Sequence, residues 1–241
     1  MEKTELKQVL KKRAIKQHSS EYLKLILERN RGGALGLVNE LADSGMYSLL
    51  DIFDILSMTQ QRVGSMWERG SITVVDEHFA TETTLDAIEI ASERIKKRFF
   101  RTKRGTALLA NFVEGEFHVI GLKMFAELLR ADGWEVEYYS SNLSVAQIFK
   151  HLERTRKSFD LICVSLTMSF NLKELQSILK ILRTNVLTKN SKIIVGSQLF
   201  RKKRFRDEMI DKETGLPLAD LLTCSFARGL EFIRSAFPSG E

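Results

Sequence analysis

Residues 106–121 of the chain are TALLANFVEGEFHVIG, a short apolar run followed by a polar segment that contains a histidine. Four further apolar runs follow it: WEVEYYS, DLICVSL, KIIVGS and DLLTCS. They alternate with segments of helical periodicity near 118–132, 144–157, 171–186, 199–211 and 226–237. This alternation predicts an α/β fold, a Rossmann-like five-stranded parallel sheet with helices on both faces.

Residues 1 to about 99 have helical periodicity and almost no strand pattern. The helical segments are 19–30, 34–45, 48–70 and 76–100. We expect Ser19 or Ser20 to cap the first helix and the four helices to form a bundle. The expected domains are a basic helical extension over 1–20, a four-helix-bundle cap with linker over 21–104, and the sheet domain over 105–241.

The composition is that of an ordinary globular protein, with 44% hydrophobic and 28% charged residues and only two prolines. No apolar stretch approaches the roughly 18 residues of a membrane span, and the N-terminus has no apolar secretory segment. We therefore expect a cytoplasmic protein without membrane contact. Cys163 and Cys224 lie in apolar runs, and we expect both to be buried free thiols.

The net charge of +6 is concentrated in basic runs at 11–16, 94–104 and 201–206. Such runs attract nucleic acid or an acidic partner, but they are also common on ordinary solvated surfaces. The charge pattern leaves these alternatives open.

His118 follows the first predicted strand, where parallel sheets bind their ligands. A neutral imidazole binds a metal through one nitrogen while the other donates to a carboxylate, for which Glu116 is close enough in sequence. Gly121 leaves room for a bulky group at the start of the next helix. Small and polar residues also follow two later strands: Ser165, Thr167, Gly196 and Ser197.

In this order, the residues resemble the three-part signature of the cobalamin-binding domain shared by methionine synthase, corrinoid methyl carriers and B12-dependent photoreceptors. The resemblance implies that His118 is the lower ligand of cobalt. It implies that Ser165, Thr167, Gly196 and Ser197 line the slot for the displaced nucleotide tail. The sequence departs from the usual pattern twice: Glu116 replaces an aspartate, and Ser197 replaces a second glycine.

A second resemblance lies in the helical part, where Trp67 is followed after nine residues by Glu77 and His78. This is similar to the Trp-x9-Glu-His motif of light-sensing regulators that bind adenosylcobalamin. The resemblance implies that Trp67 shields the upper face of the cofactor and that Glu77 helps to hold the adenosyl group. It implies that His78 ligates cobalt after light removes that group.

The preferred hypothesis is a cobalamin-dependent light sensor that is not an enzyme. The residues before Glu21 leave no room for the DNA-binding domain of those regulators, so we expect action through a transcriptional regulator or another signalling protein. DNA would be contacted only indirectly or through the basic runs, and self-association into a homo-oligomer is an option.

The alternative is a corrinoid carrier of a methyltransferase system, which uses the same fold and lower ligand. A haem-binding relative, or a domain that has lost its cofactor, is a third option. A two-histidine zinc site is less favoured, because no helix carries paired ligands at i and i+4.

Overall fold

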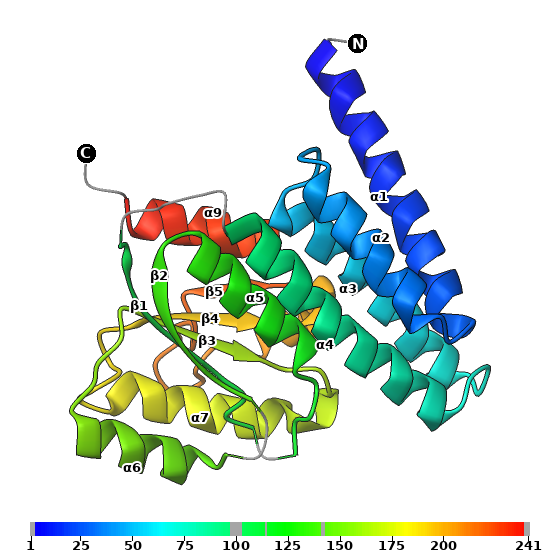
Figure 1. Cartoon of the computed structure of the whole chain (residues 1–241). Helices are drawn as coiled ribbons and strands as arrows, with labels where there is room; N and C mark the ends of the chain where they lie inside the picture. Colours follow the sequence, from blue (N-terminus) through cyan, green and yellow to red (C-terminus); the bar gives the residue numbers. More distant parts are fainter. Residues whose placement is uncertain (1–2, 97–102, 114, 141–142, 239–241) are drawn as a thin grey trace. The chain divides into compact units, whose positions relative to one another are not determined.

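The computed structural model describes residues 3–96, 103–113, 115–140 and 143–238. The chain folds into two compact units, Met1–Phe100 and Arg101–Glu241 (Figure 1). None of the described helices combines the length and the apolar character that crossing a membrane requires.

The first unit is helical, as the sequence predicts. Its helices are α1 (Lys3–Leu27), α2 (Arg31–Asp43), α3 (Leu49–Glu68) and α4 (Val74–Lys96). Side chains at three- and four-residue spacing, such as Ile52, Phe53 and Leu56 of α3, are completely buried. Ser48 and Asp51 form a capping box that fixes the start of α3. The predicted end of the last helix, 97–100, lies outside the described residues.

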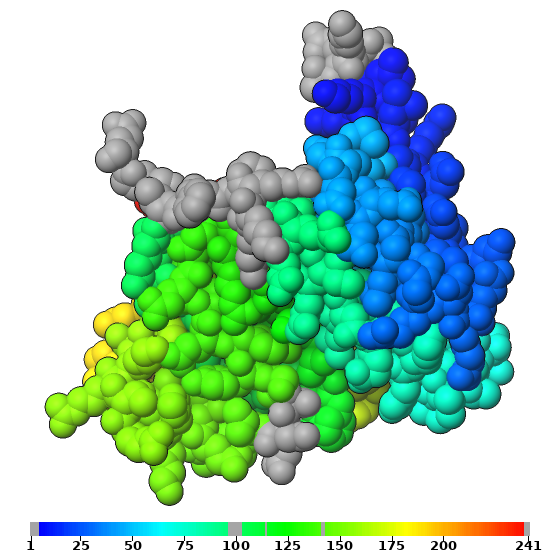
Figure 2. All heavy atoms as spheres, in the orientation of Figure 1, coloured from blue at the N-terminus to red at the C-terminus, as the bar shows by residue number. Residues whose placement is uncertain are grey.

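The start of α1 corrects the sequence prediction. The helix runs without interruption from Lys3, so neither Ser19 nor Ser20 caps it. Ser19 is buried in its middle, and its hydroxyl lies 3.0 Å from that of Thr59 on α3. A serine that pairs with a neighbouring helix was therefore mistaken for a helix start. Residues 5–13 are all exposed, and these first turns of α1 project beyond α2 (Figure 2).

The second unit contains the predicted parallel sheet. Its strands are β1 (Gly105–Ala110), β2 (Trp134–Tyr139), β3 (Leu161–Ser165), β4 (Lys192–Gly196) and β5 (Leu221–Thr223). They pair in parallel in the order β2-β1-β3-β4-β5. The order reverses direction between β1 and β3, and ligands of open α/β sheets bind at the carboxyl ends of the strands at such a point.

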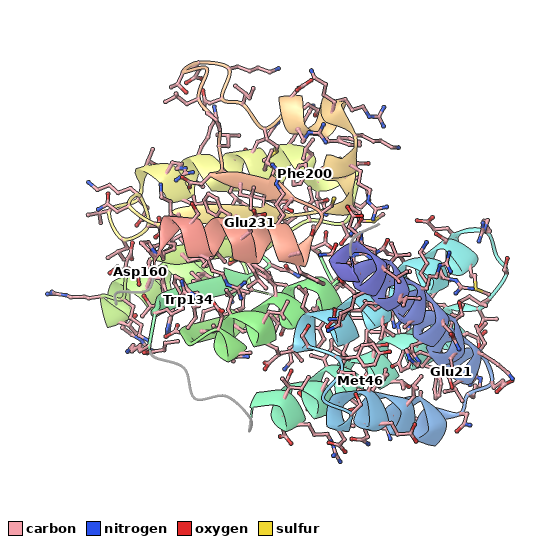
Figure 3. All side chains as sticks on the ribbon, turned by 90° about the horizontal axis from the view of Figure 1, so that it is seen from above. Glu21, Met46, Trp134, Asp160, Phe200 and Glu231 are labelled. Atoms are coloured by element: carbon pink, nitrogen blue, oxygen red, sulfur yellow. The ribbon has the colours of Figure 1, made fainter. Side chains whose placement is uncertain are left out.

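Helices cover both faces of this sheet (Figure 1). Helices α5 (Ile120–Ala131) and α9 (Phe226–Ala236) lie on one face, and α6 (Val145–Thr155) and α7 (Leu172–Thr184) on the other. On the first face, the rings of Phe125 and Phe226 stack with centroids 6.2 Å apart. Figure 3 labels Trp134 and Asp160 at the amino-terminal edge of the sheet and Phe200 toward its carboxyl end.

The helix predicted over 199–211 is wrong in detail. After the short 3-10 helix η1 (Ser169–Asn171) and β4, the chain forms a second one, η2 (Gln198–Arg201), and then α8 (Lys203–Asp207). Lys202 is extended between η2 and α8. Phe200 and Phe205 are both buried. A single α-helix turns residues five apart away from each other, so the break lets both rings reach the core.

The two cysteines differ. Cys163 in β3 is buried, and burial raises the pKa of its thiol far above the ordinary value. Cys224 is exposed, which contradicts the sequence expectation. It follows the last residue of β5, so the strand ends one residue before the apolar run suggests.

Candidate functional site

The candidate site lies where the carboxyl ends of β1 and β3 are neighbours. The strands pair directly, and the segments that follow them carry three of the predicted site residues: Glu116, His118 and Thr167. A fourth, Ser165, is the last residue of β3. Because the strand order reverses here, helices leave the two strands toward opposite faces and a crevice is expected between them.

A tight turn after β1 brings Glu116 back to the strand tips. The backbone N–H of Glu116 donates to the carbonyl of Val113 at 3.2 Å. Gly115 has φ +75°, the conformation that a type II turn requires at its third position and that glycine adopts without strain. The turn places the Glu116 side chain inside the protein, where only 1% of the residue is exposed.

The carboxylate of Glu116 joins His118 to β3. Its Oε1 contacts Nδ1 of His118, and its Oε2 accepts a 2.8 Å hydrogen bond from the backbone N–H of Thr167. Burial alone raises the pKa of Glu116, but the hydrogen bonds from His118 and Thr167 outweigh it and the net pKa lies below the ordinary value. The group is therefore a carboxylate at neutral pH, which fixes the ring of His118 through Nδ1. The imidazole remains 57% exposed.

Asn111 is a further part of the site and is absent from the residues that the sequence predicts for it. It follows β1, is buried, and accepts a 2.6 Å hydrogen bond from the hydroxyl of Ser165. A polar residue directly after an apolar strand, at the expected ligand edge, was the available signal.

Gly121, Gly196 and Ser197 occupy the same end of the sheet. A Cβ atom at Gly121 would meet no atom within 4 Å, so the space beside this first turn of α5 is open. Gly196 pairs with Ser165 in the register of β3 and β4. The hydroxyl of Ser197 accepts from the backbone N–H of Leu199 and so caps η2.

Exposed apolar side chains accompany the polar ones in the same two segments. Phe117 is 64% exposed after β1, and Met168 and Phe170 are 39% and 74% exposed after β3. No sequence pattern indicates a role for them, because apolar residues in loops are not diagnostic by themselves. Together they offer apolar surface to a large ligand.

The remaining predicted residues belong to the first unit. Trp67 lies in the last turn of α3 and is 49% exposed. Glu77 and His78 lie in the first turns of α4, with a carboxylate oxygen of Glu77 2.9 Å from Nδ1 of His78. The imidazole of His78 is 74% exposed. The same Nδ1 lies 3.0 Å from the backbone carbonyl of Val74, so two oxygen atoms face this nitrogen of His78.

Comparison with known proteins identifies relatives of the chain. A curated relative, dimethylamine corrinoid protein 1 of Methanosarcina acetivorans, is 21% identical over 141 residues. The match spans 58% of this chain and 65% of the relative. The solved structure of the Methanosarcina barkeri monomethylamine corrinoid protein matches with a TM-score of 0.69 at 18% identity. It covers 90% of this chain and 97% of that protein, and at this identity it shows a shared fold.

Two family models cover most of the described chain. Residues 106–211 match a model described as B12 binding domain, which contains every predicted site residue of the second unit. Residues 19–92 match a second model with the same description, which includes Trp67, Glu77 and His78. The helical segment 19–92 and the α/β segment 106–211 of the chain are thus each similar to a B12 binding domain.

Proposed function

We propose that the chain is a corrinoid carrier protein: it holds cobalamin for methyl transfer between partner enzymes and is not itself the catalyst. The observation that carries this proposal is the half-exposed imidazole of His118, held from behind by the buried carboxylate of Glu116 at the carboxyl ends of β1 and β3. The corrinoid proteins of methylamine systems among its relatives support a carrier over a sensor.

The residues of the second unit fit a corrinoid. Imidazole is a good cobalt ligand, and a carboxylate on its second nitrogen is the usual support of such a ligand. The open space at Gly121 accommodates a group beside α5. Phe117, Met168 and Phe170 present apolar surface of the kind that a large macrocycle covers.

Each residue of this set has a proposed part. His118 is the lower cobalt ligand, and Glu116 orients its ring and keeps Nδ1 protonated. Gly121, Ser165, Thr167, Gly196 and Ser197 border the space for the nucleotide tail. Bound cobalamin would supply a cobalt centre that accepts and releases methyl groups. Partner enzymes would supply the methyl donor and acceptor.

The test compares the purified chain with His118→Ala. We expect the wild-type protein to bind hydroxocobalamin and to give an absorption spectrum of histidine-ligated cobalt. The variant should lose that spectrum and bind at least about 10-fold more weakly, because loss of a group that only supports a metal ligand already costs about 10- to 100-fold. His151→Ala on α6 is the matched control, with no change expected. Equal binding and spectra for His118→Ala and wild type would reject the proposal, and preferential uptake of haem would replace it with the haem alternative.

A light sensor is the second candidate, and one observation favours it. His78 is exposed, its Nδ1 lies near the Val74 carbonyl and the Glu77 carboxylate, either of which can support a metal-bound imidazole, and Trp67 is half-exposed. A carrier has no evident use for this second histidine. In this reading adenosylcobalamin is the cofactor, Trp67 and Glu77 protect its adenosyl group, and His78 replaces that group after illumination.

Illumination of the protein loaded with adenosylcobalamin tests this candidate. We expect the wild-type spectrum to change to that of cobalt with two histidine ligands, and His78→Ala to end in a different spectrum. Size-exclusion chromatography before and after light reports whether self-association follows. Identical spectra for the two illuminated proteins would eliminate the sensor and leave the carrier untouched. A transcriptional partner, and contact of the basic runs with DNA, are proposals only within this reading.

A further inference from the structure

The side chain of Asn111 lies between two parts of the candidate site. It is 2% exposed, and its Oδ1 accepts the 2.6 Å hydrogen bond from Ser165, the last residue of β3. Its Nδ2 faces the carbonyl oxygens of Glu116 and His118, each at 3.5 Å. One amide group therefore spans from the tip of β3 to the backbone on both sides of Phe117.

The chemistry of a carboxamide suits this position. It has an acceptor oxygen and a donor nitrogen, so it accepts from a hydroxyl and donates to carbonyl groups at the same time. An aspartate has no donor for the carbonyls, and an alanine leaves buried polar groups without partners.

The segment that carries His118 is thus attached at two places, to the last residue of β3 and to the segment that follows it. One attachment is the carboxylate of Glu116 on the backbone of Thr167, and the other is Asn111 on the hydroxyl of Ser165. Glu116 orients the imidazole ring itself. Asn111 acts on the backbone at positions 116 and 118, from which that ring projects.

We propose that Asn111 and Ser165 are positioning residues that set the height of the His118 imidazole above the strand tips and so the strength of its bond to cobalt. This inference rests on the proposed binding of cobalamin through His118. It also gives Ser165 a different task from bordering the nucleotide tail, since its hydroxyl hydrogen is engaged inside the protein.

Ser165 is the better position for a substitution that does not disturb folding, because it is only partly buried at the end of its strand. Ser165→Ala removes the hydroxyl, whereas Ser165→Thr keeps it. Asn111→Ala and Asn111→Asp test the other partner, the aspartate retaining the acceptor and losing the donor. Ser177→Ala on α7, whose hydroxyl donates to Lys173 on its own helix, is the matched control.

The measurements are the dissociation constant for hydroxocobalamin and the electron paramagnetic resonance of the reduced cobalt(II) form. Protein labelled with 15N-histidine identifies the axial nitrogen, because its splitting pattern changes with the isotope. At saturating cobalamin, we expect Ser165→Ala and Asn111→Ala to lower the histidine-ligated fraction and to weaken binding about tenfold. Ser177→Ala should match the wild type, Ser165→Thr should restore the histidine-ligated fraction that Ser165→Ala loses, and Asn111→Asp should resemble Asn111→Ala.

The outcomes separate the inference from the function on which it rests. If His118→Ala abolishes the histidine signal while Ser165→Ala keeps both affinity and splitting, the positioning role is wrong and the carrier stands. If His118→Ala itself changes nothing, the proposed function fails first. Should Asn111→Ala not fold, as judged by circular dichroism, the pair Ser165→Ala and Ser165→Thr decides the question alone.

Discussion

Oε1 of Glu116 contacts Nδ1 of His118, so a fully buried carboxylate supports a ring that is more than half exposed. The ring thus has one side fixed by the protein and a surface open to a ligand. The charge of Glu116 matters here, because an imidazole N–H donates more strongly to a carboxylate than to a neutral acceptor.

Replacement of Glu116 by glutamine tests this arrangement. Glu116→Gln keeps the shape of the side chain and removes the charge, so the ring loses its charge-assisted bond. We expect cobalamin affinity to fall by about 10- to 100-fold, as for other groups that support a metal ligand. Isothermal titration with hydroxocobalamin measures it. Glu208→Gln on the surface after α8 should leave the affinity unchanged, and an equal loss in both variants would speak against a specific role.

Gly121 tests whether the open space beside α5 is used. A leucine at this position meets no atom of the chain within 4 Å of its Cβ, so we expect the free energy of unfolding to change by less than about 1 kcal/mol. If the bound ligand occupies this space, the same side chain should weaken binding by about 1–3 kcal/mol, which is about 5- to 150-fold in affinity.

Gly32 is the matched control for Gly121. It is also the second residue of its helix, α2, and a Cβ there likewise meets nothing within 4 Å. Gly32→Leu should alter neither folding nor affinity. Normal cobalamin binding by Gly121→Leu would show that the cofactor does not enter beside α5.

Asp54 makes the stability of the first unit depend on pH. Burial, and then the nearby carboxylate of Asp51, raise the pKa of Asp54 from 3.8 to about 6. The folded protein therefore binds this proton more tightly than the unfolded chain does. The resulting stabilisation is complete below pH 3.8 and is lost as the pH rises through about 6.

Asp54→Asn removes a charge that is unfavourable at neutral pH. The difference between a pKa of 3.8 and one of about 6 corresponds to about 3 kcal/mol of stability, which solvent screening at this partly exposed group reduces to about 1 kcal/mol. We expect urea unfolding to show the variant more stable by that amount at pH 8 and equal to the wild type at pH 4.

Asp76 supplies the opposite sign for comparison. Its pKa is lowered to about 2, first by the hydroxyl of Thr73, with which it caps α4, and then by the backbone of Thr73 and by Arg29. The stabilisation of the folded protein by Asp76 is present above pH 3.8 and is lost as the pH falls through about 2. Asp76→Asn should thus destabilise the protein at pH 8. If Asp54→Asn and Asp76→Asn changed the stability at pH 8 in the same direction, the opposite pKa changes of the two carboxyl groups would be contradicted.

The sequence was sufficient for the fold where burial alone decides it. The parallel strands are short and, apart from β2 with its Glu135 and Glu137, mostly apolar, so each run predicted its strand to within one or two residues. It was insufficient where a contact between distant segments decides. Ser19 lies inside the long helix α1, where its hydroxyl pairs with that of Thr59 on α3. The predicted helix over 199–211 is interrupted at Lys202, which allows both Phe200 and Phe205 to reach the core.

The candidate site was predictable to a similar degree. The polar residues after β1 and β3 were found because strand ends of parallel sheets meet at one edge, and the contact of Glu116 with His118 follows from their spacing. The hydrogen bond between Asn111 and Ser165 joins residues 54 positions apart, and no local sequence pattern predicts it. The exposure of Phe117 and Phe170 could not be predicted either, because it depends on whether distant segments of the chain pack against these side chains.

The contrast between the two cysteines has a practical use. A maleimide dye added to the folded chain reaches the exposed thiol of Cys224 and not the enclosed one of Cys163. The label then stands just past β5, whose Thr223 pairs with Gly196. Corrins absorb visible light, so fluorescence quenching at this natural attachment point would record the capture and release of the vitamin in real time, without any engineered mutation.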